Sequence, residues 1–62
     1  MERHIAVEFG HGLPIQHYRA DELAAKTFAD AVQRQGLAKW ITIDDLVTDA
    51  LKELPYQRLF QQ

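Results

Sequence analysis

The sequence contains no cysteine, no serine and no asparagine among its 62 residues. Without cysteine, the chain has no disulfides, no thiolate zinc ligands and no thiol nucleophile. Without serine as well, the common hydrolytic nucleophiles are missing. The composition therefore predicts a protein that is not an enzyme, and nothing in it indicates a cofactor.

Basic excess and long apolar runs are also missing. The formal net charge is −2 and the pI is about 5.8, which argues against a generic binder of phosphate backbones. No apolar run approaches the roughly 20 residues that span a bilayer. The first four residues do not resemble the basic start of a secretory signal. We therefore expect a cytoplasmic protein with no membrane partner.

The short length limits the hydrophobic core. A chain of this size buries only about 60% of the surface that its unfolded form exposes. Because disulfides are excluded, self-association is the expected reinforcement. The sequence therefore predicts one small domain over residues 1–62 that forms a homo-oligomer, either a dimer or a higher assembly.

Residues 4–18 show the clearest local pattern, a predicted β-hairpin. A three-residue turn at 10–12 would pair Phe9 with Leu13 and Ile5 with His17. This register places the aliphatic side chains on one face: Ile5, Val7, Phe9, Leu13 and Ile15. It also places His4 and His17 on opposite faces of the sheet.

Four further segments follow the hairpin. Apolar spacing predicts a helix over 21–35 that begins at Asp21 and ends before Gly36. A β-branched and aromatic run predicts a strand over 39–43. A second apolar stripe predicts a helix over 44–54, and an apolar tail covers 55–62. The expected fold is α+β, a small β-β-α-β-α domain with both helices packed on one face of the sheet.

The uncovered sheet face is the predicted binding surface. In the expected register it shows His4, Ala6, Glu8, Gln16, Tyr18, Trp40 and Thr42. Aromatic residues frequently anchor protein interfaces, so Trp40, Tyr18, His4 and Gln16 are the candidate partner-binding residues. The alternative places Trp40 in the core, with Ile41 and Ile43 facing outward.

The tail and the ionisable residues offer weaker signals. Tyr56 and Phe60 in the tail either fold back onto the domain or dock on a partner. The three histidines do not converge in the expected register, so no metal site is predicted. Asp44, Asp45 and Asp49 fall at a helix start and on its exposed side, where capping explains them without acid–base chemistry.

The segment over residues 45–54 resembles the second helix of ribbon-helix-helix repressors. The resemblance implies a dimer whose N-terminal strands enter the major groove of DNA, with Arg3, His4 and Arg19 supplying contacts. We treat this as the alternative function. The favoured interpretation is a small non-enzymatic regulatory module that acts through self-association and by binding another protein.

Overall fold

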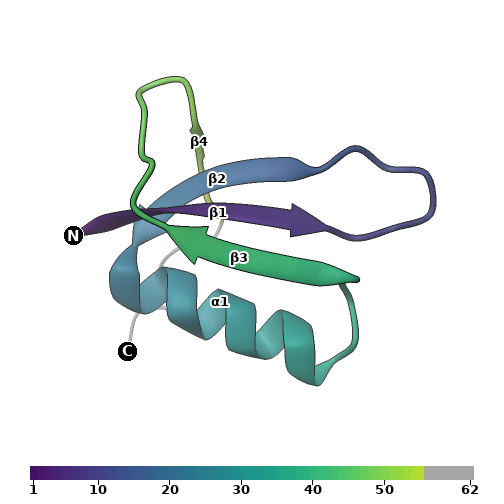
Figure 1. Cartoon of the computed structure of the whole chain (residues 1–62). Coiled ribbons are helices and arrows are strands. Elements are labelled where there is room, and N and C mark those ends of the chain that lie inside the picture. The colour runs from purple at the N-terminus through teal and green to yellow at the C-terminus, as the bar shows by residue number, and fades with distance from the viewer. Residues whose placement is uncertain (56–62) are drawn as a thin grey trace.

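The computed structural model describes residues 1–55, which form one helix and four strands. In chain order the elements are β1 (Glu2–Glu8), β2 (Gln16–Asp21), α1 (Glu22–Arg34), β3 (Trp40–Asp44) and β4 (Lys52–Glu53). The strands form one sheet in the order β3-β1-β2-β4. The central strand β1 is antiparallel to β2 and β3, while β4 is parallel to β2. Helix α1 covers one face of this sheet (Figure 1).

Helix α1 confirms the helix predicted over 21–35. Its N-cap is Asp21, whose Oδ2 accepts a hydrogen bond from the backbone N–H of Leu23 at 3.1 Å. This bond satisfies one of the amide groups that a helix start leaves without a partner. The helix ends before Gly36, whose φ of 64° is favourable only for glycine.

The core lies between α1 and the sheet and is made largely of small side chains. Ile5 and Val7 of β1 are fully buried. The residues packed around Ile5 are Ala20, Ala24, Ala25 and Leu54, with the partly buried Tyr18, Phe28, Ile41 and Ile43 at the margin. Because alanine side chains are short, α1 lies close to the sheet.

The hairpin forms, but its register differs by one position from the expected one. Val7 lies opposite Gln16 rather than Ile15, and Ile5 lies opposite Tyr18 rather than His17. A shift of one residue exchanges the two faces of a strand. Tyr18 therefore packs on the core, and Gln16 shares its face.

The connection between β1 and β2 explains the shift. It covers residues 9–15, and three successive residues, at 10–12, have φ values of 91°, 57° and 77°. Leu13 and Ile15 lie in this connection rather than in the core, with 55% and 43% of their surface exposed. The second strand begins only after Pro14, which cannot donate a ladder hydrogen bond.

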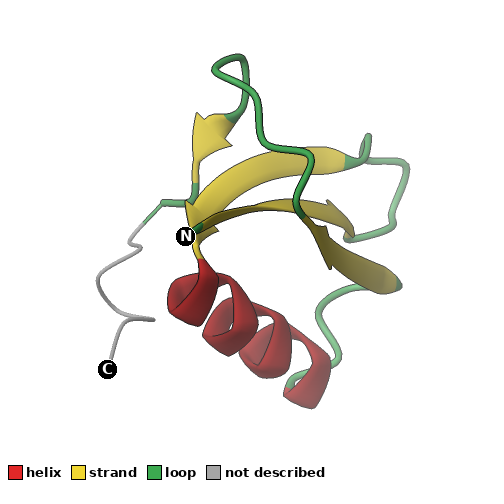
Figure 2. Ribbon diagram, turned by 60° about the vertical axis from the view of Figure 1, so that its left-hand side comes forward, coloured by secondary structure: helices red, strands yellow, loops and turns green. Residues whose placement is uncertain are grey.

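The helix predicted over 44–54 is wrong, and so is the β-β-α-β-α fold class. Local turns replace it: Leu46 N–H bonds to Asp44 Oδ1, and Leu51 N–H bonds to the carbonyl of Thr48. Strand β4 then pairs with β2 and delivers Leu54 to the core. Aspartate, threonine and valine are modest helix formers, and pairing along β2 outweighs the helical spacing. The observed order is β-β-α-β-β (Figure 2).

Of the remaining predicted elements, one is confirmed and one falls on residues that the structure does not describe. The strand expected over 39–43 is confirmed as β3, one residue further along. The tail residues Tyr56 and Phe60 lie outside the described residues. Within residues 1–55, no helix is long and apolar enough to cross a membrane.

Candidate functional site

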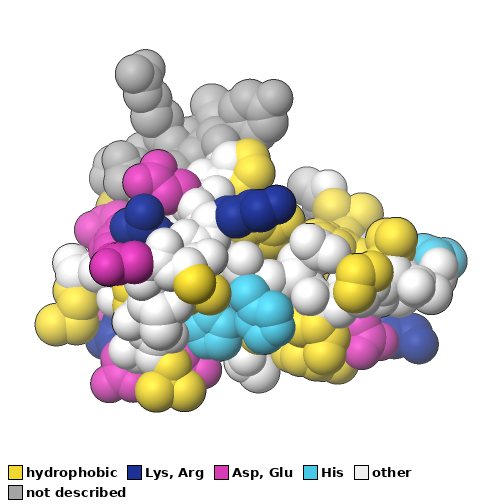
Figure 3. Space-filling view, turned by 90° about the horizontal axis from the view of Figure 1, so that it is seen from above, with side chains coloured by type: hydrophobic (Ala, Val, Ile, Leu, Met, Phe, Trp, Pro, Cys, Tyr) yellow, Lys and Arg dark blue, Asp and Glu magenta, His cyan; other side chains and the backbone are white. Residues whose placement is uncertain are grey.

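The face of the sheet away from α1, here called the open face, carries an array of polar side chains. Strand pairing places on it His4, Ala6 and Glu8 of β1, His17 and Arg19 of β2, and Trp40, Thr42 and Asp44 of β3. Figure 3 looks onto this face and shows histidine side chains forming a continuous patch in its middle. Contrary to expectation, His4 and His17 share this face.

Three of these side chains form a hydrogen-bonded chain across three strands. His4 Nδ1 lies 2.9 Å from Asp44 Oδ1, and His4 Nε2 lies 2.9 Å from His17 Nδ1. His4 pairs directly with Asp44 across the sheet and is diagonal to His17, which is opposite Ala6. We call Asp44, His4 and His17 the histidine chain.

The two imidazole rings meet end to end. Their planes are within 7° of parallel and their centres are 5.2 Å apart. For two nitrogens 2.9 Å apart, the ring centres are farthest from each other when both nitrogens lie on the line between the centres. The observed separation of the ring centres is about this maximum, so the two rings lie nearly in one plane. The bond therefore runs along the direction in which ring N–H groups and lone pairs point.

This geometry assigns the ring protons. A carboxylate only accepts, so the hydrogen on His4 Nδ1 points to Asp44 and His4 Nε2 is an acceptor when the ring is neutral. His17 then donates its Nδ1–H to His4, which leaves His17 Nε2 with a lone pair. The histidine chain therefore has its hydrogen-bond donors directed towards Asp44 and its remaining acceptor on His17.

Asp44 is stabilised as a carboxylate. The backbone N–H of Leu46 and the ring of His4 both bond to Asp44, and these bonds hold the pKa of its carboxyl below the usual value of 3.8. The same oxygen, Oδ1, accepts both bonds at 2.9 Å. Asp44 therefore links the histidine chain to the start of the connection between β3 and β4.

Arg19 forms a second polar cluster next to the histidine chain. Its Nε donates to the carbonyl of Leu51 at 3.1 Å, and its Nη1 lies 3.3 Å from Glu2 Oε2. Its Nη2 is 3.7 Å from Glu53 Oε1. Arg19 thus joins β1, β4 and the segment that leads into β4.

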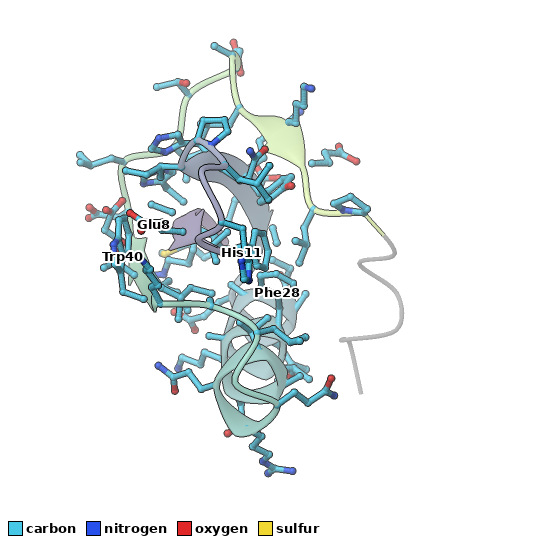
Figure 4. All side chains as sticks on the ribbon, turned by 90° about the vertical axis from the view of Figure 1, so that its right-hand side faces the viewer. Glu8, His11, Phe28 and Trp40 are labelled. Carbon is cyan, nitrogen blue, oxygen red and sulfur yellow. The ribbon has the colours of Figure 1, made fainter. Side chains whose placement is uncertain are left out.

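Four of the seven large, exposed apolar side chains within residues 1–55 lie in segments at one end of the domain. The connection 9–15 contributes Leu13 and Ile15, the segment 35–39 contributes Leu37, and β3 begins there with Trp40. The two segments touch, because a Cβ added to Gly10 would lie 3.3 Å from Lys39 Cε. We call Leu13, Ile15, Leu37 and Trp40 the hairpin end. Figure 4 views it and shows Trp40 beside Glu8, its partner on β1.

The predicted partner-binding residues are thus distributed over different places. Trp40 lies on the open face and is 39% exposed, so the interpretation that placed it in the core is wrong. His4 is on the open face as expected, but it is engaged in the histidine chain. Gln16 and Tyr18 lie on the α1 face instead. Tyr56 and Phe60 are outside the described residues.

The residues that the sequence interpretation missed are His17 and Asp44. The signal for His17 was the apolar alternation of Tyr18 and Ala20, which competes with that of Leu13 and Ile15 and sets the true register. Asp44 was explained as a helix cap. It does cap the N–H of Leu46, but in a turn.

The histidine chain lacks the convergence of a metal centre. Within residues 1–55, no group of three histidine, cysteine, aspartate or glutamate side chains is arranged to hold a metal ion. Both ring nitrogens of His4 and Nδ1 of His17 are engaged in hydrogen bonds of the histidine chain, which leaves few ring nitrogens to bind a metal ion. Comparison of the chain with protein-family models, curated proteins and solved structures finds no match.

Proposed function

We propose that this chain is a small, cytoplasmic, non-enzymatic module that self-associates and binds another protein through its hairpin end. The observation that carries the proposal is the group of four exposed apolar side chains there; Met1, Leu23 and Leu46 are exposed elsewhere, before β1, in the first turn of α1 and after β3. Leu13, Leu37 and Trp40 are 55%, 53% and 39% exposed, although the core has few large side chains. Contiguous exposed apolar surface is typical of sites where proteins meet.

The composition of the hairpin end supports protein as the partner. Trp40 combines a large apolar ring with an N–H donor, a combination enriched at the energetic centres of interfaces. Leu13 and Ile15 flank Pro14 in the connection, so their positions depend little on the core. A partner that covered these side chains would gain apolar burial without disturbing the packing against α1.

The DNA-binding alternative has no structural observation in its favour. Strand β1 is flanked by β2 and β3 and has no free edge for a twin strand. Arg3 donates from Nε and Nη2 to Glu22 Oε1 at 3.1 and 2.7 Å, which lowers the pKa of that carboxyl. Arg19 is similarly engaged by Glu2. The segment that resembles a repressor helix is not helical.

Site-specific photo-crosslinking in the native host tests the partner site. A photoreactive amino acid at position 13 is expected to give a discrete covalent adduct with one protein, which Leu37→Ser abolishes. The matched control carries the same group at position 46, where Leu46 is 70% exposed but follows the end of β3 opposite to Trp40. Equal adducts from both positions, or none from position 13, would contradict the proposed site.

Sedimentation equilibrium tests self-association. We expect the mass of the purified chain to rise with concentration from the 7.2 kDa of a monomer towards a dimer or a higher assembly. A monomer at every concentration up to the millimolar range would remove self-association from the proposal.

A further inference from the structure

The two edges of the sheet differ in how they are covered. Strand β2 is flanked by β4, and the ladder continues where Leu54 N–H bonds to the carbonyl of Arg19 at 2.9 Å. Strand β3 pairs with β1 on one side only. Among residues 1–55, no strand pairs with its other side, so its outward backbone groups form an open edge.

This edge carries none of the usual protections within its central part. The residues Ile41, Thr42 and Ile43 include no proline and no charge, and β-branched side chains favour strand pairing. Ile41 and Ile43 pack against the core but stay only partly buried. A further strand along β3 would cover the apolar surface that they leave exposed.

A second copy of β3 fits this edge in one register especially well. Antiparallel pairing centred on Thr42 uses all five strand residues, from Trp40 to Asp44. It places Ile41 opposite Ile43 of the partner copy on the α1 face, because directly opposed residues share a face. Both copies then keep their helices on the same side of one continuous sheet.

Charge complementarity favours the same register. Lys39 and Asp45 flank β3 and are equally distant in sequence from Thr42, so each meets the other across the symmetric pair. Lys39 Nζ lies 3.8 Å from Glu8 Oε2, and the Lys39 side chain is 68% exposed. A surface ion pair of this kind contributes little stability, so Lys39 can turn from Glu8 to a partner copy at small cost. Moving the register by two positions separates these opposite charges and shortens the overlap of the strands.

We propose that a second copy of this chain pairs antiparallel with the open edge of β3, with Thr42 opposite Thr42 of the partner copy. The inference rests on the self-association proposed above and assigns its site. The two-fold symmetry closes the assembly, because each copy uses the same edge and leaves no further β3 edge free.

Disulfide trapping tests the register directly, since the natural chain has no cysteine. Directly opposed residues of antiparallel strands have Cα atoms about 4.5–5.5 Å apart, within the range that a disulfide bridges. Thr42→Cys is expected to give a covalent dimer under mild oxidation. The matched control is Thr48→Cys, also an exposed threonine, in the segment between β3 and β4, which is expected to stay monomeric in the same gel.

Charge reversal tests the flanking contacts. Lys39→Glu and Asp45→Lys each place like charges opposite one another, and each is expected to weaken dimerisation at least tenfold in sedimentation equilibrium. The double variant restores opposite charges and is expected to recover most of the affinity. Circular dichroism confirms that each variant keeps its fold.

The outcomes separate this inference from the function on which it rests. A dimer that persists with Thr42→Lys, and that does not crosslink through Thr42→Cys, overturns the β3 register while self-association stands. A natural chain that is monomeric throughout overturns both. Crosslinking through Thr42→Cys with rescue by the double charge reversal supports the proposed pairing.

Discussion

On the α1 face of the sheet, Ile5 and Val7 are buried against short alanine side chains, whereas on the open face His4 and Asp44 are held by directed hydrogen bonds. Apolar burial depends on volume and tolerates small changes of angle. Hydrogen bonds depend on direction and on protonation. The same three strands are therefore stabilised by packing on one side and by a pH-sensitive network on the other.

The largest expected effect is on the α1 face. Ile5→Ala removes a fully buried side chain from the centre of the core and is expected to cost about 2–5 kcal/mol of the free energy of unfolding. Chemical denaturation followed by circular dichroism measures it. A loss below 1 kcal/mol would mean that packing on this face does not dominate.

The next effect is on the open face. His4→Ala removes the middle of the histidine chain and leaves Asp44 and His17 without their ring partner. Because water can reach both groups, the expected cost is that of ordinary hydrogen bonds, about 0.5–1.5 kcal/mol. His17→Ala is the matched control, since it breaks only the outer bond and should cost less. Equal losses in denaturant titrations would show that the inner bond to Asp44 contributes nothing.

A smaller effect is the pH dependence of stability, which is expected from the open face and not from the apolar α1 face. Because the folded protein lowers the pKa of Asp44, its carboxylate stabilises the fold above the ordinary value of 3.8, and this contribution disappears as the pH falls through the lower folded value. Asp44→Asn should therefore be less stable than the natural chain near pH 6 and lose less stability below pH 4. Thermal unfolding from pH 6 to pH 2 measures both slopes, and parallel slopes would refute the assignment.

The smallest effect is expected where an apolar residue lies on neither face. Leu13→Ser changes a half-exposed side chain in the connection 9–15 and should alter the unfolding free energy by no more than about 0.5 kcal/mol. Thermal unfolding of Leu13→Ser and Ile5→Ala under the same conditions compares the two effects directly. A loss comparable to that of Ile5→Ala would place Leu13 in the core after all.

The sequence pattern predicted the elements with unambiguous local signals. Helix α1 was found from its apolar spacing and from Asp21 and Gly36 at its ends, and β3 from its β-branched run. Strands β1 and β2 were also found, but two alternations compete in the second strand. Leu13 and Ile15 suggest one face, and Tyr18 and Ala20 the other. Only packing against α1 decides between them, and that information is not local.

In the candidate site, too, local patterns were predictable from the sequence and contacts between distant residues were not. For Trp40 the sequence left two orientations open, towards the open face or towards the core, and the packing of Ile41 and Ile43 against the core selects the first. The histidine chain depends on the register of β2 and on the position of β3 beside β1, so no local pattern could bring His4, His17 and Asp44 together. The apolar residues of 45–54 have helical spacing, yet the segment forms β4 and places Leu54 in the core. The edge of β2 that β4 pairs with exists only in the folded sheet, so no local pattern indicates it.

The alanines at positions 20, 24 and 25 have a consequence for how this domain can diversify. They lie between the helix and the sheet, and none of the three has any surface exposed. A larger side chain at any of these positions would push α1 away from the strands. Sequence change without loss of the fold is thereby confined to the perimeter, where new binding preferences arise.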